Sequence, residues 1–263
     1  MPGRLDQILS TTRQSLPTLQ GRRAALEREV ERAPSIPTSL RSALRRPTVA
    51  VIAELKRRSP SAGSIREDLD PAQRAALYEQ HGAAALSVLT DGPFFGGSME
   101  DLRTASDNCS LPILRKDFIL DEVQVLEARA AGASAVLLIV RVLGKARLKP
   151  LLRYCGDLGL DALVEVHSQS ELEIALDSEA RIVGINSRDL DTFTIEAEAA
   201  WRLLGKVPSE TIAVAESGIV RQADVVRVAR AGADAVLVGT ALSESQAPEE
   251  LLRELSEVKR HDR

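Results

Sequence analysis

Short apolar runs alternate with amphipathic stretches along most of this chain, and three segments share one pattern. Residues 81–89, 131–138 and 231–238 each end a helical stretch, place a glycine, and continue into an apolar run. Glycine just past a helix adopts the left-handed conformation without the steric penalty of a Cβ. The apolar run suits a strand covered on both faces, as in parallel sheets. We therefore predict three helix–glycine–strand units.

The spacing of these units predicts how many more there are. Gly82 and Gly132 are 50 positions apart, and Gly132 and Gly232 are 100 apart. A compact strand–helix unit of roughly 25 residues divides both intervals. Further apolar runs complete a set of eight strands, at residues 49–54, 111–116, 161–166, 181–186 and 211–216. Helical patterns lie between the strands, for example at residues 71–80, 121–131, 168–176, 221–231 and 248–258.

Strict alternation of strands and helices predicts parallel strands joined by right-handed crossovers. Eight units favour the α/β class and a single (β/α)8 TIM barrel. The main rival is an open doubly wound sheet, which usually has a glycine-rich phosphate turn after its first strand, and none is present here. We predict that residues 1–48 form an N-terminal helical extension packed on the barrel, and that residues 49–263 form the barrel catalytic domain.

Composition narrows the function class. Hydrophobic residues make up 44% and charged residues 27%, with a net charge of −4, which excludes a disordered chain. No apolar run approaches the ~20 residues that span a bilayer, and residues 1–6 lack the apolar core of a secretory signal. Few basic patches and 3% aromatics disfavour nucleic-acid binding. Cys109 and Cys155 are expected to be reduced thiols in a cytoplasmic protein, and three scattered histidines suggest no metal site.

Polar side chains stand at the predicted strand ends, where a barrel of this type builds its active site. They are Glu54 and Lys56, Lys116, Glu165, Asn186 and Arg188, Glu216 and Ser217. A single glutamate there is most simply a surface charge or part of a salt bridge. Burying a charge is costly unless the charge is paired or used, so five strands ending this way favour an active site.

The lysines are unevenly distributed. The chain has 28 arginines and only six lysines, yet Lys56 and Lys116 both lie at strand ends. Desolvation can lower the pKa of a lysine toward neutrality, whereas arginine stays charged. These two lysines therefore indicate either proton chemistry or a compact grip on an anion. His167 follows the Glu165 strand and could border the site, although a polar loop role is the simpler interpretation.

The loops after the last two strands are typical of a phosphate site. Gly218, Gly239 and Thr240 lie there, and small residues let backbone N–H groups approach a phosphate closely. Two tight turns would explain the glycines equally well. The basic run 56–58 is expected to steer a small anion, and residues 59–63 to act as a flexible lid.

At this point several segments are similar to a known family. The matching segments are residues 52–61, 89–91, 95–98, 112–118, 163–167, 184–190, 215–219 and 238–240. They resemble the indole-3-glycerol-phosphate synthase family, in order and over nearly the whole barrel. The resemblance implies ring closure, decarboxylation and dehydration of 1-(2-carboxyphenylamino)-1-deoxyribulose 5-phosphate in tryptophan biosynthesis. It also implies that no metal or organic cofactor is used.

The family's site residues carry over position by position. By resemblance, Lys116 is the acid that protonates the substrate carbonyl, and Glu165 is the base or proton relay for dehydration. Glu54 holds the lysines, and Lys56 grips either the carboxylate or the phosphate. Asn186 and Ser217 complete the catalytic set. The implied substrate-binding residues are Ser59, Phe95, Phe118, Leu137, Arg188, Leu190 and Glu216, with Phe94 as an alternative to Phe95.

Two other functions stay open at this stage. A different phosphosugar barrel enzyme, phosphoribosylanthranilate isomerase, needs a cysteine at the end of the first strand, where this chain has none. A non-catalytic barrel would bind a phosphorylated ligand or a protein partner, and the presence of Lys56, Lys116 and Glu165 argues against it. We expect a phosphorylated small molecule as partner, no nucleic acid or membrane, and a monomer or weak homodimer.

Overall fold

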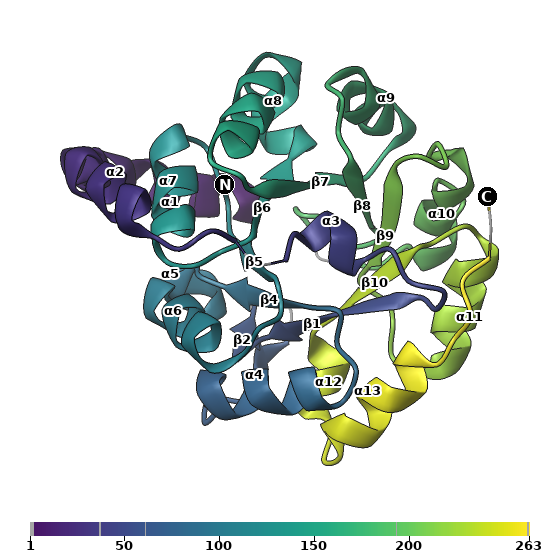
Figure 1. Cartoon of the computed structure of the whole chain (residues 1–263). Coiled ribbons are helices and arrows are strands. Elements are labelled where there is room, and N and C mark those ends of the chain that lie inside the picture. The colour runs from purple at the N-terminus through teal and green to yellow at the C-terminus, as the bar shows by residue number, and fades with distance from the viewer. Residues whose placement is uncertain (1–2, 37, 61, 193, 262) are drawn as a thin grey trace.

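Eight parallel strands close into a barrel in a computed structural model that describes residues 3–36, 38–60, 62–192, 194–261 and 263 (Figure 1). Around the barrel the strands follow the order β1 (Ala50–Leu55), β4 (Ala85–Leu89), β5 (Ile113–Lys116), β6 (Ala135–Ile139), β7 (Asp161–Val166), β8 (Ile182–Asn186), β9 (Ile212–Glu216) and β10 (Ala235–Val238). Each strand pairs in parallel with its neighbours. The predicted TIM barrel is therefore confirmed.

Helices surround the barrel on its outer face (Figure 1). Those after β1 are α4 (Pro71–Gln80), α5 (Gly92–Phe95), α6 (Met99–Asn108), α7 (Glu122–Ala130), α8 (Val140–Asp157), α9 (Gln169–Asp177), α10 (Ala197–Trp201), η1 (Leu204–Lys206), α11 (Gln222–Arg230), α12 (Thr240–Glu244) and α13 (Pro248–Ser256). Gly82, Gly132 and Gly232 have φ values of 101°, 91° and 105°. All three glycines thus adopt the left-handed conformation that the repeat predicts.

Three helices precede the first strand: α1 (Arg4–Gly21), α2 (Arg23–Arg32) and α3 (Leu40–Ala43). Ile8 of α1 is buried in the same apolar cluster as Phe118 and Leu190, which lie beyond the C-terminal ends of their strands. Helix α2 packs on α7. Helix α3 lies across the end of the barrel at which the strands begin (Figure 1). Leu40 of this helix is fully buried.

Strand alternation decides which side chains reach the barrel interior. On β1, Val51 and Ala53 belong to the outer core between strands and helices, whereas Ile52 belongs to the inner cluster. Successive strand side chains point to opposite faces, so Glu54 points inward two positions after Ile52. The same period brings Glu165 and Glu216 to the interior, two positions after Leu163 and Val214.

The loop after β1 contains a short antiparallel hairpin, β2 (Arg58–Ser59) with β3 (Gly63–Ser64). Its basic residues are held by the protein. Arg57 pairs with Asp101, and Arg58 Nη2 donates to Gly92 O over 2.7 Å. The expected steering of a small anion is therefore not what these two side chains do here. Part of the predicted lid, residue 61, lies outside the described residues.

Across the described part of the chain, no helix combines the length and the apolarity that crossing a membrane requires.

Candidate active site

A cavity of about 260 Å³ opens at the C-terminal ends of the strands. Among the predicted site residues, its lining includes Glu54, Lys56, Phe95, Lys116, Phe118, Leu137, Glu165, Asn186, Arg188, Leu190, Glu216, Ser217, Gly218, Gly239 and Thr240. Every predicted site residue except Ser59 therefore meets in one place. They come from all eight strands of the barrel or from the segments that directly follow them.

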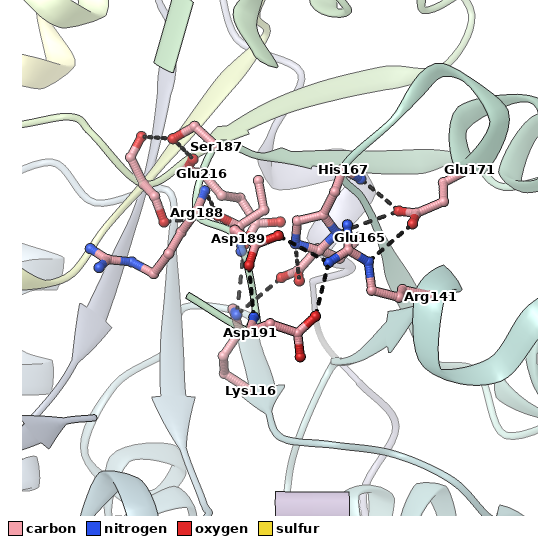
Figure 2. Close-up of polar contacts among 12 residues, drawn as sticks. Lys116, Arg141, Glu165, His167, Glu171, Ser187, Arg188, Asp189, Asp191 and Glu216 are labelled. Atoms are coloured by element: carbon pink, nitrogen blue, oxygen red, sulfur yellow. Dashed lines mark hydrogen bonds and ion pairs between the residues drawn. The ribbon is translucent and has the colours of Figure 1, made fainter. Parts of the chain in front are cut away.

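Lys116 is the centre of the charged part of the cavity. Its Nζ lies 3.3 Å from Glu165 Oε2 and 3.7 Å from Glu216 Oε2. The three residues come from β5, β7 and β9, alternate strands whose inward side chains share a layer in this fold. Figure 2 shows the lysine with Glu165 and Glu216 beside it. The lysine side chain is 16% exposed, and both carboxylates are almost completely buried.

The carboxylates set the protonation of this group. Burial lowers the pKa of Lys116, but the charges of Glu165, Glu216 and Glu54 outweigh burial and raise the pKa above its ordinary value. The sequence suggested that desolvation lowers the pKa of this lysine, but here the nearby carboxylates outweigh desolvation. The surrounding carboxylates therefore favour the ammonium form of Lys116.

The two buried glutamates have opposite protonation preferences. Burial alone would raise the pKa of Glu165, but Lys116 and His167 hold it below its ordinary value. Burial, together with the nearby charge of Glu165, raises the pKa of Glu216 to about 8. Two carboxylates beside one ammonium share its charge unequally. Glu165 is therefore the ionised partner of Lys116, and Glu216 is a protonated acid at neutral pH.

The second lysine forms a separate pair. Lys56 Nζ lies 3.5 Å from Glu54 Oε1, and the Glu54 side chain is 6% exposed. Ser87 Oγ donates to the other oxygen of Glu54 over 3.4 Å. Glu54 thus links the two lysines, because it pairs with Lys56 and its charge also acts on Lys116.

Two glycines make room for the buried carboxylates. A Cβ at Gly184 would overlap the carboxylate of Glu216, and a Cβ at Gly239 would overlap that of Glu54. Gly239 precedes α12, so its small size serves the charged pocket as well as the turn. Any side chain at either position would displace a carboxyl group of the cavity.

The turn after β9 is conformationally unusual. Ser217 has φ = 65° and Gly218 has φ = 77°. A non-glycine residue in this region is strained, and such strain concentrates at functional sites. Ser217 Oγ donates to Asn186 Oδ1 over 2.9 Å, and the same oxygen accepts from the backbone N of Arg188 over 3.0 Å. The Asn186 side chain therefore connects the turns after β8 and β9.

An apolar wall faces the charged groups. The rings of Phe95 and Phe118 lie 6.4 Å apart between centroids, and Phe95 rather than Phe94 lines the cavity. The sequence interpretation missed Ile195 and Val220, which also line it and are 43% and 62% exposed. Large apolar residues within predicted loops were the signal that could have identified them.

Ser59 is the predicted residue that the structure does not bring to the cavity. It is buried in the hairpin after β1, where its Oγ accepts a hydrogen bond from Ala62 N over 3.1 Å. This geometry gives a structural role to the side chain and no support to substrate binding.

His167 is closer to the chemistry than the sequence interpretation favoured. Its Nε2 lies 3.4 Å from Glu165 Oε1, and its side chain is 5% exposed. A histidine two positions after an inward-facing glutamate, directly beyond the end of its strand, was the signal. Among the residues that the structure describes, no group of three or more histidine, cysteine or acidic side chains has the arrangement of a metal site.

Comparison with known proteins decides the family. The family model described as indole-3-glycerol phosphate synthase matches residues 5–255. The chain belongs to this family. Among relatives named indole-3-glycerol phosphate synthase, the protein of Leptospira interrogans is 50% identical, over 79% of this chain and 82% of that protein. The Parafrankia protein is 47% identical over 95% and 94%, and the Opitutus terrae protein is 44% identical over 97% and 98%.

A solved structure of thiamine phosphate pyrophosphorylase from Pyrococcus furiosus resembles this chain in fold. Its TM-score is 0.60 at 16% sequence identity, and the match covers 82% of this chain and 96% of that one. At this identity the likeness concerns the barrel alone. The site chemistry of this indole-3-glycerol phosphate synthase family member rests on its own residues.

Proposed function

We infer that this chain is an indole-3-glycerol-phosphate synthase, a carboxy-lyase of tryptophan biosynthesis. It closes the ring of 1-(2-carboxyphenylamino)-1-deoxyribulose 5-phosphate and releases carbon dioxide and water. The observation that carries this conclusion is that Lys116 Nζ lies 3.3 Å from Glu165 and 3.7 Å from Glu216, in a cavity that also has an aromatic wall. Ring closure onto a carbonyl needs an acid beside the oxygen, and dehydration needs a base nearby.

We assign the acid step to Lys116 and the base step to Glu165. As the aryl carbon attacks the ribulose carbonyl, the ammonium of Lys116 gives its proton to the carbonyl oxygen. Loss of carbon dioxide then restores the aromatic ring. Glu165, whose pKa is held below its ordinary value, removes the proton from the carbon beside nitrogen. Lys116, which is reprotonated after ring closure, gives a second proton to the hydroxyl that leaves as water. Glu216 is a neutral hydrogen-bond donor to the substrate in this scheme.

The remaining residues position the substrate. Phe95, Phe118, Leu137 and Leu190 would enclose the aryl ring, which keeps the reacting carbons near contact. The turns at Gly218, Gly239 and Thr240 would hold the phosphate through backbone N–H groups. Lys56, oriented by Glu54, would grip the carboxylate or the phosphate, and Arg188, Asn186 and Ser217 would donate to the intermediates.

A direct assay tests this function. Indole fluorescence is followed after the anilino-ribulose phosphate is added to purified protein without added metal. We expect multiple turnovers. Binding without turnover would instead favour a non-catalytic barrel, and turnover of phosphoribosylanthranilate alone would favour the isomerase.

The remaining parts of the proposal concern organisation and location. We propose residues 1–48 as an extension of the barrel domain 49–263, a monomer or weak homodimer, and a cytoplasmic location. Limited proteolysis, sedimentation velocity and cell fractionation test these three statements in turn.

A further inference from the structure

Glu165 and His167 lie in the wall between two cavities. Glu165 lines the candidate active site, whereas His167 lines a second cavity of about 660 Å³. Asn186 lines both cavities. The second cavity is also lined by Arg141, Asp189, Asp191, Thr192 and Glu196, among others. The two cavities therefore adjoin at Asn186 and at the contact between Glu165 and His167.

His167 bridges two carboxylates. Its Nε2 lies 3.4 Å from Glu165 Oε1, and its Nδ1 lies 3.4 Å from Glu171 Oε2 (Figure 2). Glu165 Oε1 and both ring nitrogens are buried, and none of them meets hydrogen-bond geometry with the described residues. These unsatisfied atoms face one another at distances that a small ring movement would convert into hydrogen bonds. Buried polar atoms in this state require an explanation.

The outer end of this line of groups reaches solvent. Glu171 Oε2 accepts the backbone N–H of His167 over 2.7 Å, and Arg141 Nε lies 3.3 Å from Glu171 Oε1. Arg141 Nη1 also lies 3.3 Å from Asp189 Oδ2. Side-chain exposure rises from 1% at Glu165 and 5% at His167 to 14% at Glu171 and 30% at Arg141. Charged groups thus extend continuously from the buried base to the open cavity.

The proposed reaction needs a route for protons. One proton goes to the carbonyl oxygen and a second goes to the hydroxyl that leaves as water, while one is removed from carbon. The carboxylate leaves as carbon dioxide without a proton of its own. Each turnover therefore takes up one net proton from solvent. A bound substrate fills the cavity that Lys116 and Glu165 face, so a route through the opposite wall stays open.

We propose that His167 is the proton-exchange partner of Glu165 and connects it with solvent in the second cavity. A proton from solvent reaches Nδ1 through Glu171, whose side chain is 14% exposed, and the ring passes the proton on Nε2 to Glu165 Oε1. Glu165 then delivers a proton to Lys116, which restores the acid. The ring is then protonated at Nδ1, and rotation of the side chain, which turns the protonated nitrogen back toward Glu165, restores the starting arrangement. No bond to carbon changes. This inference rests on the proposed function, because it supplies the proton which that reaction consumes.

Four charged side chains surround His167 and influence how it exchanges protons. They are Glu165 on β7, Glu171 on α9, Arg141 on α8 and Asp189 in the loop after β8. Two carboxylates lie against the ring itself, and Arg141 reaches it only through Glu171. The ring therefore shuttles protons in an anionic setting, and its loss should change the pH profile of kcat.

The test compares His167→Gln and His167→Ala with wild type. We expect kcat to fall about 10- to 100-fold in both variants with little change in KM, because proton transfer is lost and binding is kept. Added imidazoles should restore kcat in His167→Ala, with rates that follow the pKa of the imidazole. A kcat and pH profile of wild-type shape in His167→Gln would overturn the proposal. A loss that no imidazole repairs would also overturn it, because it would indicate a structural role alone.

The matched control is His81→Gln. His81 caps the C-terminal end of α4, and its ring contacts Arg253, so the same chemical change is made far from both cavities. It should leave kcat and the pH profile unchanged. If wild type itself does not turn over the anilino-ribulose phosphate, the proposed function fails. If wild type is active and the variants behave as it does, only the relay fails.

Discussion

At the C-terminal end of the barrel three carboxylates act on one ammonium, whereas at the N-terminal end the described carboxylates have their own partners. Asp234, just before β10, accepts from Ala213 N over 2.8 Å and pairs with Arg263 at 2.6 Å. Asp161 accepts from Arg41 N over 2.8 Å. We call the C-terminal end of the barrel the upper end and the N-terminal end the lower end. At the upper end, the pKa of Glu216 is raised to about 8 and Ser217 has a positive φ.

The difference indicates that the lower end of the barrel contributes to the stability of the fold, whereas the upper end provides the reactive groups. Carboxylates with backbone donors and arginine partners are satisfied in one fixed arrangement, which stabilises the folded state. Buried carboxyl groups that outnumber their positive partners can gain or lose protons easily, but they lower the free energy of unfolding. Substitutions at the upper end should therefore remove activity and spare the fold, and substitutions at the lower end should do the reverse.

The largest effect is expected for Lys116→Met at the upper end. We expect kcat to fall by about 10³-fold or more, because the acid is lost while the shape of the side chain is kept. The melting temperature should fall little, since the freed glutamates can take up protons. Fluorescence assays and thermal melts measure both quantities. Lys145→Met is the control, because that side chain is 64% exposed. Near-normal turnover in Lys116→Met would refute its role as the acid.

Glu165→Gln comes next. The amide keeps the size of the carboxylate and removes the base, so we expect dehydration to slow by about 10²-fold with substrate binding nearly unchanged. Single-turnover mixing with rapid quench should reveal a ring-closed intermediate that accumulates. Unchanged single-turnover kinetics would contradict the assignment of the base.

At the lower end, Asp234→Ala should lower the free energy of unfolding by about 3 kcal/mol, because a buried N–H and two arginines lose their partner. Its kcat should stay within about twofold of wild type, since distant sites act independently. Urea denaturation and the fluorescence assay measure the two effects. In the control Asp177→Ala, an exposed pair with Lys145 is removed, for which we expect less than about 0.5 kcal/mol. Equal losses in both variants would remove the contrast between the ends.

The last expected effect is a pH dependence of the free energy of unfolding. Burial, with the charge of Glu165, raises the pKa of Glu216 from 4.5 to about 8. Between these values the folded protein keeps a proton that the unfolded chain has released, so the stabilising contribution of this group is lost as the pH rises toward 8. Glu216→Gln has no such proton. Urea denaturation from pH 5 to 8 should therefore show a shallower decline for Glu216→Gln, by up to about 1.4 kcal/mol per pH unit. Parallel curves for wild type and variant would contradict the raised pKa.

The barrel and most of its site could be predicted because both depend on local patterns. The left-handed glycines at 82, 132 and 232 and the apolar runs after them mark the strand starts. Inward-facing positions repeat every second residue along each strand. In a closed parallel barrel all strand ends meet at one edge, so residues far apart in sequence were expected together before any distance was known.

The tertiary structure decided which ionisable side chains lie close enough to shift one another's pKa. Neither the raised pKa values of Lys116 and Glu216 nor the lowered one of Glu165 follows from a strand-end pattern, because they depend on distances between β5, β7 and β9. The engagement of Arg57 by Asp101 and the place of Ser59 in the hairpin also depend on contacts across the loop. Sequence determined the fold and the positions of the side chains along each strand, through local geometry. Packing determined their protonation, because electrostatic interactions act through space.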